Sequence, residues 1–154
     1  MNDSTWKDKA ELIGVIAILA TLILLIVEIN SNTAATRSQI RQSTADGVRQ
    51  FTLAFSSDEK IRDLVLSDEG IESLSRSDAN AIGAFSHAYF MTVEEAYLQW
   101  TNGFLDEELW LNRKNHALWW LQQRRVRELW DTWQGRGYFT DSFMAVMNAE
   151  LEAR

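Results

Sequence analysis

The sequence predicts an all-α protein in which a single N-terminal transmembrane helix continues into a long amphipathic helix, followed by a small bundle of about four or five helices. Three observations support this fold class. Sixteen apolar or small residues run unbroken from Leu12 to Val27. The chain contains no Pro and only 7 Gly among its 154 residues, so few residues interrupt helices. Beyond the apolar run, hydrophobic residues recur at spacings of three and four, which is the period of an α-helix.

The length of the apolar run favours a membrane anchor. At a rise of 1.5 Å per residue the run spans about 24 Å, and the flanking residues up to Ile29 extend it toward the roughly 30 Å hydrocarbon core of a bilayer. A cleaved secretory signal and a buried core helix are the alternatives. The run is long for a signal peptide, and so short a chain could hardly surround it. We therefore divide the chain into an N-terminal tail (1–10), a transmembrane helix (11–29) and a helical membrane-proximal domain (30–154).

Two sets of residues in this region are candidates for helix packing. Within the run, small residues at spacings of three and four form a stripe that either admits a second helix or faces lipid. We name the residues just beyond the run the polar collar, since a ring of copies would bring them together at a polar mouth. The anchor residues are Leu12, Gly14, Ala17, Thr21 and Val27, and the polar collar is Glu28, Asn32, Thr33 and Arg37.

Basic residues predict the orientation of the anchor. Lys7 and Lys9 precede the apolar run, whereas Arg37, Arg41 and Arg49 follow it. Because positive charge is enriched on the cytoplasmic side of membrane helices, this excess favours a cytoplasmic helical domain.

The remaining helices follow from periodicity and capping residues. The first helix is expected from about residue 5 to residue 56, with one side formed by residues 33, 36, 40, 44, 48, 51 and 55. Ser56 and Glu59 have capping-box spacing and predict a short second helix that ends near Ser67. Ser75 or Ser77 begins a central aromatic helix that ends at Asn102-Gly103. A fourth helix over 105–125, a segment over 126–134 and a last helix capped by Thr140 complete the bundle.

Charged residues in the bundle give two further predictions. Glu94 lies on the central aromatic helix, where a buried carboxylate needs a partner, and Arg41 is a candidate for a structural ion pair with it. A second group, which we name the basic–aromatic cluster, is either a core of rings with solvated arginines or a patch that contacts anionic lipid or an acidic partner. Its members are Arg113, Arg124, Arg125, Arg127, Trp119 and Trp120.

Composition excludes several function classes. The net charge of −7 argues against nucleic acid as a partner, because phosphate binding needs a basic surface. The absence of Cys removes disulfides, thiolate metal sites and cysteine nucleophiles. The two histidines, His87 and His116, have no spacing typical of a zinc or di-iron site. No nucleotide motif or catalytic triad is visible. The sequence therefore predicts no catalytic residue, no metal site and no cofactor.

Three motifs carry a resemblance to a known group of proteins. The patterns are I-x-x-N-T-x-A-x-R from Ile29 to Arg37, E-x-A-Y-x-Q from Glu94 to Gln99, and G-x-L-D-E-E-x-W from Gly103 to Trp110. With these motifs the chain resembles a widespread group of uncharacterised small bacterial membrane proteins that have one N-terminal transmembrane helix and a helical domain. The resemblance covers most of the chain up to Trp110 and is loose after it. It implies an architecture and no catalytic residue.

These observations predict a non-enzymatic single-pass membrane protein that acts as a scaffold, accessory subunit or assembly factor of a membrane complex. The expected partners are the lipid bilayer and either further copies of the chain or another membrane complex. The alternative is a homo-oligomeric pore with the polar collar at the membrane exit. A membrane-bound helical enzyme is disfavoured, because no acid, base, nucleophile and cofactor set converges in the sequence.

Overall fold

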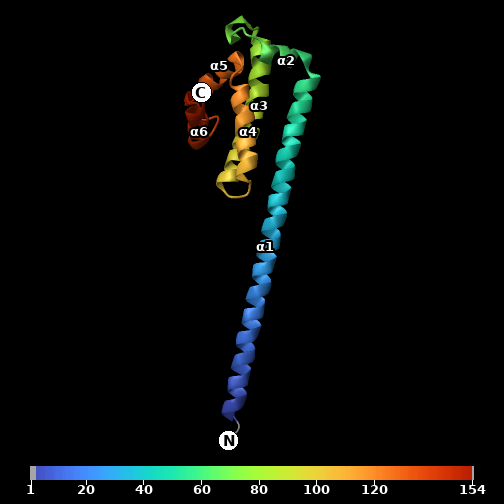
Figure 1. Cartoon of the computed structure of the whole chain (residues 1–154), viewed down its shortest axis with the longest axis vertical. Helices are drawn as coiled ribbons and strands as arrows, with labels where there is room; N and C mark the ends of the chain where they lie inside the picture. The colour runs from blue at the N-terminus through green and yellow to red at the C-terminus, as the bar shows by residue number, and fades with distance from the viewer. Residues whose placement is uncertain (1–2, 154) are drawn as a thin grey trace. The chain divides into compact units, whose positions relative to one another are not determined.

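The computed structural model describes the backbone of residues 3–153 and the side chains of residues 6, 7 and 9–153. Over this range there is no β-strand, so the predicted all-α fold class is confirmed. The chain forms two compact units, Met1–Gln39 and Ile40–Arg154. The elements (Figure 1) are α1 (Asp3–Ser57), α2 (Glu59–Leu66), the 3-10 helix η1 (Ile71–Ser73), α3 (Arg76–Thr101), α4 (Glu107–Trp120), α5 (Arg124–Trp133) and α6 (Asp141–Glu152).

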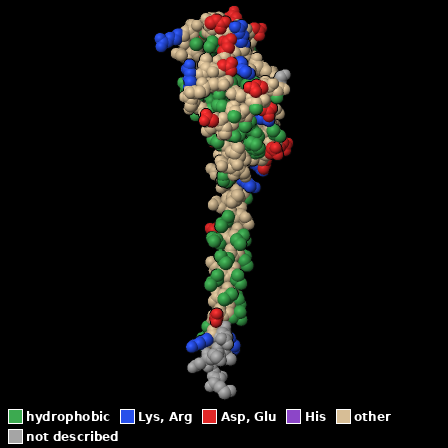
Figure 2. Space-filling model, turned by 90° about the vertical axis from the view of Figure 1, so that its left-hand side faces the viewer, with side chains coloured by type: hydrophobic (Ala, Val, Ile, Leu, Met, Phe, Trp, Pro, Cys, Tyr) green, Lys and Arg blue, Asp and Glu red, His purple; other side chains and the backbone are tan. Residues whose placement is uncertain are grey.

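The first unit is a helix with exposed side chains on every face. The tail predicted for residues 1–10 is helical from Asp3 onward, and Met1 and Asn2 lie outside the described residues. From Glu11 to Asn32 every side chain is exposed. Figure 2 shows hydrophobic side chains clustered along this part of the helix. Among the described helices, α1 alone is long and apolar enough to cross a membrane by length and composition.

In the second unit, one side of α1 joins the core of the bundle. The predicted period is observed: Ile40, Phe51 and Phe55 pack against the buried cluster. The Phe51 ring centroid lies 4.5 Å from that of Tyr89 and 5.2 Å from that of Trp120. These contacts attach the C-terminal part of α1 to both α3 and α4.

Helix α3 is the centre of the bundle, as its apolar stripe predicts. It contacts α2, α4 and α5. Its N-terminus is capped by Ser75, whose Oγ accepts a hydrogen bond from Asp78 N at 3.2 Å. At its C-terminus Asn102 is the cap, and Gly103 adopts a left-handed φ of 75° that favours glycine. Its buried residues are Ile82, Ser86, Tyr89, Phe90, Val93, Ala96 and Tyr97.

Two predicted helix boundaries are wrong. Asp58, and not Ser56, caps α2, and its side chain accepts from Ile61 N at 3.0 Å. The reason is that α1 continues through Ser57, so the Ser56 hydroxyl donates to Thr52 O inside that helix. The chain also turns at residues 121–123, so α5 begins at Arg124 where the prediction extended the fourth helix to residue 125.

The predicted cap of the last helix is correct in position and different in chemistry. Thr140 is the N-cap of α6, but its side chain makes no capping hydrogen bond. Its backbone N–H instead donates to Glu94 Oε1 at 2.6 Å. A carboxylate from α3 therefore satisfies the start of α6, through a bond between residues that lie 46 positions apart in the sequence.

Two adjacent tryptophans provide a test of this core. Trp120 is 2% exposed and contacts Phe51 and Phe55, whereas Trp119 is 42% exposed. We expect Trp120→Ala to lower the free energy of unfolding by about 3 kcal/mol, the low end for a buried ring, because it also removes an indole N–H that has no partner among the described residues. We expect Trp119→Ala to cost less than about 1 kcal/mol. Urea titration of the detergent-solubilised chain, followed by circular dichroism, measures both, and equal losses would contradict this packing.

Candidate functional site

Two arginines of the second unit are buried. Arg113 is 7% exposed and Arg125 is 4% exposed. Trp120 is also buried, while Trp119 and Arg124 are exposed and Arg127 is half-buried. The basic–aromatic cluster is therefore not one surface, and its interpretation as a single lipid or partner patch is wrong. The physical reason is that α4 turns Arg113 and Trp120 toward the core and Trp119 toward solvent, while α5 buries Arg125 and exposes Arg124. Buried charge is costly unless it is bonded, so the partners of the two buried arginines decide their roles.

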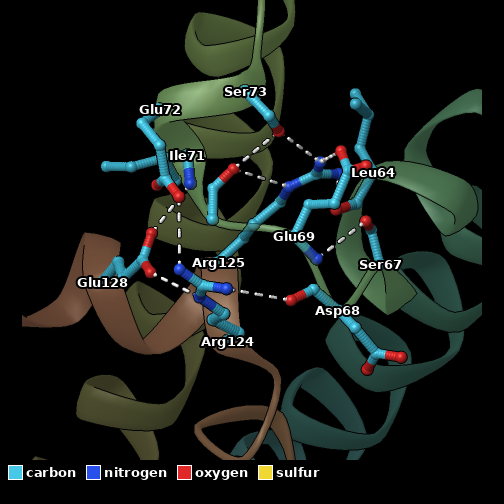
Figure 3. Close-up of polar contacts among 11 residues, drawn as sticks. Leu64, Ser67, Asp68, Glu69, Ile71, Glu72, Ser73, Arg124, Arg125 and Glu128 are labelled. Carbon is cyan, nitrogen blue, oxygen red and sulfur yellow. Dashed lines mark hydrogen bonds and ion pairs between the residues drawn. The ribbon is translucent and has the colours of Figure 1, made fainter.

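Arg125 is a structural residue with most of its donors satisfied. It lies on α5 and reaches the loop between α2 and α3 (Figure 3). Its Nη1 donates to Leu64 O at 3.0 Å, and its Nε donates to Gly70 O at 3.4 Å. Its Nη2 donates to Ser73 Oγ at 3.0 Å and lies 3.3 Å from Glu69 Oε2. One buried guanidinium thus holds the irregular segment 67–75 on the bundle.

Glu128 completes this network from the next turn of α5. Its Oε2 accepts from Ile71 N at 2.8 Å, and its Oε1 accepts from Arg124 Nε at 2.9 Å (Figure 3). The backbone hydrogen bond from Ile71 and then the Arg124 guanidinium hold the pKa of the Glu128 carboxyl below its usual range. Arg124 also donates to Asp68 O at 3.2 Å. Together, α5 side chains bind the backbone of the loop at several points.

Arg113 has a different environment, a groove between α4 and the C-terminal part of α1. Its Nη2 donates to Thr44 O at 2.9 Å. Among the described side chains no carboxylate lies within ion-pair distance of it. Burial lowers the pKa of its guanidinium, which still carries its charge at neutral pH. The groove has a volume of about 450 Å³ and is lined by Arg41, Thr44, Ala45, Val48, Thr52, Leu109, Asn112, Arg113 and His116.

His116 adds a polar, uncharged edge to this groove. Its Nδ1 and the Tyr89 hydroxyl are 2.9 Å apart and share a hydrogen bond. Burial and then the nearby Arg113 charge lower the pKa of His116, so its ring is neutral at pH 7. Burial raises the pKa of Tyr89 above its usual range, so its hydroxyl keeps its proton. Arg113 is therefore the buried charged group in the lining of this groove, and the exposed Arg41 is the other charged group.

The predicted ion pair between Arg41 and Glu94 is not formed. Arg41 pairs with Asp106, which directly precedes α4. Glu94 accepts from the backbone of Thr140 at the start of α6. Arg41 and Glu94 each connect two parts of the bundle, but with other partners than the predicted ones. The sequence position of Asp106 alone carries no sign of a bond to α1.

The two threonines of the anchor and the polar collar use their hydroxyls within α1. The Thr21 hydroxyl donates to Ala17 O at 2.9 Å, and the Thr33 hydroxyl donates to Ile29 O at 2.8 Å. Hydroxyls bonded to the preceding helical turn are common in apolar surroundings. Leu12, Gly14, Ala17, Val27, Glu28, Asn32 and Arg37 are all exposed.

Sequence reasoning missed the roles of Thr44 and Glu128. The Thr44 carbonyl binds Arg113 from 69 positions away, and no residue pattern reports a backbone acceptor at that distance. Glu128 follows Arg124 by four residues, so helical charge spacing could have signalled that pair. Among the side chains that the structure describes, no three His, Asp or Glu residues converge in a geometry that could hold a metal ion.

Comparison of the chain with protein-family models, curated proteins and solved structures found no match in any of the three. The resemblance to small bacterial membrane proteins therefore stays a prediction. The apolar N-terminal helix is consistent with it.

The neighbours Arg124 and Arg125 test the α5 network as a matched pair. We expect Arg125→Met to lower the free energy of unfolding by about 3 kcal/mol, because it leaves the carbonyls of the half-buried Leu64 and the buried Gly70 without their charged donor. Arg124→Met should have a much smaller effect, since solvent screens that exposed side chain. Chemical denaturation of both variants against the unmodified chain measures the difference. Equal stability of the two variants would show that Arg125 does not hold the loop.

Proposed function

We propose that this is a non-enzymatic single-pass protein of the bacterial inner membrane, which holds a helical domain at the cytoplasmic surface as a scaffold, accessory subunit or assembly factor. The observation that carries this proposal is the uncovered apolar segment of α1. Thirteen large hydrophobic side chains from Leu12 to Ile29 are at least 49% exposed. The chain provides no cover for them among its described residues.

The energetics of that exposure support a bilayer around the segment. Removing one large aliphatic side chain from water is worth about 1.5–3 kcal/mol, so thirteen are worth on the order of 20 kcal/mol. This exceeds the roughly 5–15 kcal/mol by which a domain is stable. In water, this free energy would therefore favour transfer of the helix into an apolar environment. Lipid tails supply such a phase on every face, whereas a single partner helix would cover one face.

The second unit supports a binding role. It has its own buried aromatic core, so α1 provides a membrane attachment without supplying all the stability of the bundle. Arg37, Arg41 and Arg49 follow the apolar run, which favours the cytoplasmic side for the domain. A pore is less well supported, since Thr21, the one hydroxyl in the apolar run, donates to its own helix. Such a span offers water no continuous polar face.

A charge placed in the apolar run tests the anchor. We expect Leu19→Arg to reduce membrane retention strongly, because an Arg at the centre of a transmembrane helix costs about 3 kcal/mol on insertion scales. Leu53→Arg is the matched control, because Leu53 is an exposed residue of the same helix outside the run. Carbonate washing of membranes followed by immunoblotting measures retention. Release of the unmodified chain by carbonate as a water-soluble monomer would contradict the proposal and favour a cleaved signal or a soluble core helix.

Mild solubilisation followed by native mass spectrometry tests the scaffold role. We expect the intact chain to be retained in a larger assembly, and Asn32→Leu with Thr33→Leu in the polar collar to alter its size or weaken retention. Gln42→Leu with Ser43→Leu is a control pair of exposed polar residues on the same helix. A closed ring of identical copies would favour the pore, and unrelated subunits would favour the accessory role. A monomer that is unaffected by the collar substitutions would count against both.

A further inference from the structure

The groove around Arg113 has features that the anchor and scaffold role do not explain. Its lining residues all lie between Arg41 and His116, within the second unit. We propose that this groove binds a small organic anion, a carboxylate or phosphate ester carried on an apolar body, with Arg113 as the counter-ion. This proposal does not depend on the membrane anchor, because none of the lining residues belongs to the first unit.

The charge of the lining selects an anion. The chain has 22 acidic and 15 basic residues, yet the lining contains two arginines and no acidic side chain. Arg41 at this groove is paired with Asp106, so its charge is partly neutralised. Arg113 pairs with no described carboxylate and is 7% exposed. Its charge therefore acts in partly desolvated surroundings, where electrostatic attraction to a ligand is stronger than at an open surface.

The donors of Arg113 are available, in contrast to those of Arg125. A guanidinium has five N–H donors. Arg125 uses all three of its nitrogens on four acceptors of its own chain. Arg113 donates through Nη2 to the Thr44 carbonyl, and neither of its other nitrogens is among the fully buried atoms left without a partner. Those nitrogens therefore have access to the groove, where a carboxylate or phosphate could accept from Nε or Nη1 and from the second N–H of Nη2 in parallel.

The other lining residues favour a ligand whose uncharged part is apolar and small. Ala45, Val48 and Leu109 give the groove apolar walls, and Thr52 and Asn112 add uncharged polar groups. A volume of about 450 Å³ lies within the roughly 300–1,000 Å³ of small-molecule sites. Apolar walls with a few polar groups are the usual composition of such sites. A bare inorganic ion would leave these walls in contact with water, which is why we assign an organic anion.

Binding to the full chain in nanodiscs of zwitterionic lipid tests the site. The probes are phenylacetate and phenyl phosphate, and phenylacetamide is the neutral control of matched shape. We expect saturable calorimetric binding of both anions and at least tenfold weaker binding of the amide. Arg113→Gln should weaken anion binding about tenfold or more, in line with the loss of a charged hydrogen-bond donor. Arg127→Gln removes the same charge outside the groove and should leave binding unchanged.

A second variant keeps the test decisive if Arg113→Gln fails to fold. Ala45→Trp fills the groove from its α1 wall, retains Arg113, and changes an exposed position. It should abolish binding of both anions. Equal affinity for the amide, full binding by the Ala45→Trp variant, or no saturable binding of either anion would overturn the proposal. Adding phosphatidylglycerol to the nanodiscs distinguishes the ligand sources: competition with phenyl phosphate identifies a lipid headgroup, and undiminished binding identifies a soluble anion.

Discussion

The contact of Phe51 and Phe55 with Tyr89, Phe85 and Trp120 is the interaction on which the attachment of α1 to the bundle, and with it the groove, depends. It attaches the end of α1 to the two longest helices of the bundle. Because α1 lies there, the Thr44 carbonyl can accept from Arg113, and Ala45 and Val48 can wall the groove beside it. A helix that carries the apolar segment at one end thus also completes the bundle at the other. Large rings suit this contact, since each buries much area and meets its neighbours edge-on or tilted.

Burial imposes a desolvation cost on both Arg113 and Arg125, but the two side chains differ in the partners that offset it. Arg125 is surrounded by acceptors from α2 and the segment that connects α2 to α3. Its charge therefore holds in place a loop that contains few apolar residues. Arg113 has one backbone acceptor and an open groove. A satisfied buried charge is typical of structure, and a partly satisfied one beside a cavity indicates a ligand.

Much of the fold could be predicted because helical periodicity is a local property. The stripe on α1, the central position of α3 and its caps at Ser75 and Asn102 followed from residues close to one another in the chain. The turn at residues 121–123 could not be predicted in this way, since it contains no Gly or Pro and its apolar and polar residues fit a continuing helix. The Arg41 partner was missed because Asp106 lies 65 positions away. In the candidate site, the enrichment of Arg and Trp was visible in the sequence, but the division between buried and exposed members was not.

By itself the sequence determined that the chain is helical and that one segment is apolar on all faces. These properties depend on residue type, on spacing and on the absence of proline, and they need no knowledge of distant contacts. The tertiary structure alone decided which charges are buried, which acceptors they find and where a groove remains. The reason is that burial of a side chain depends on helices brought together from far along the chain, so residues of the same type, such as Arg113 and Arg124, reach opposite environments.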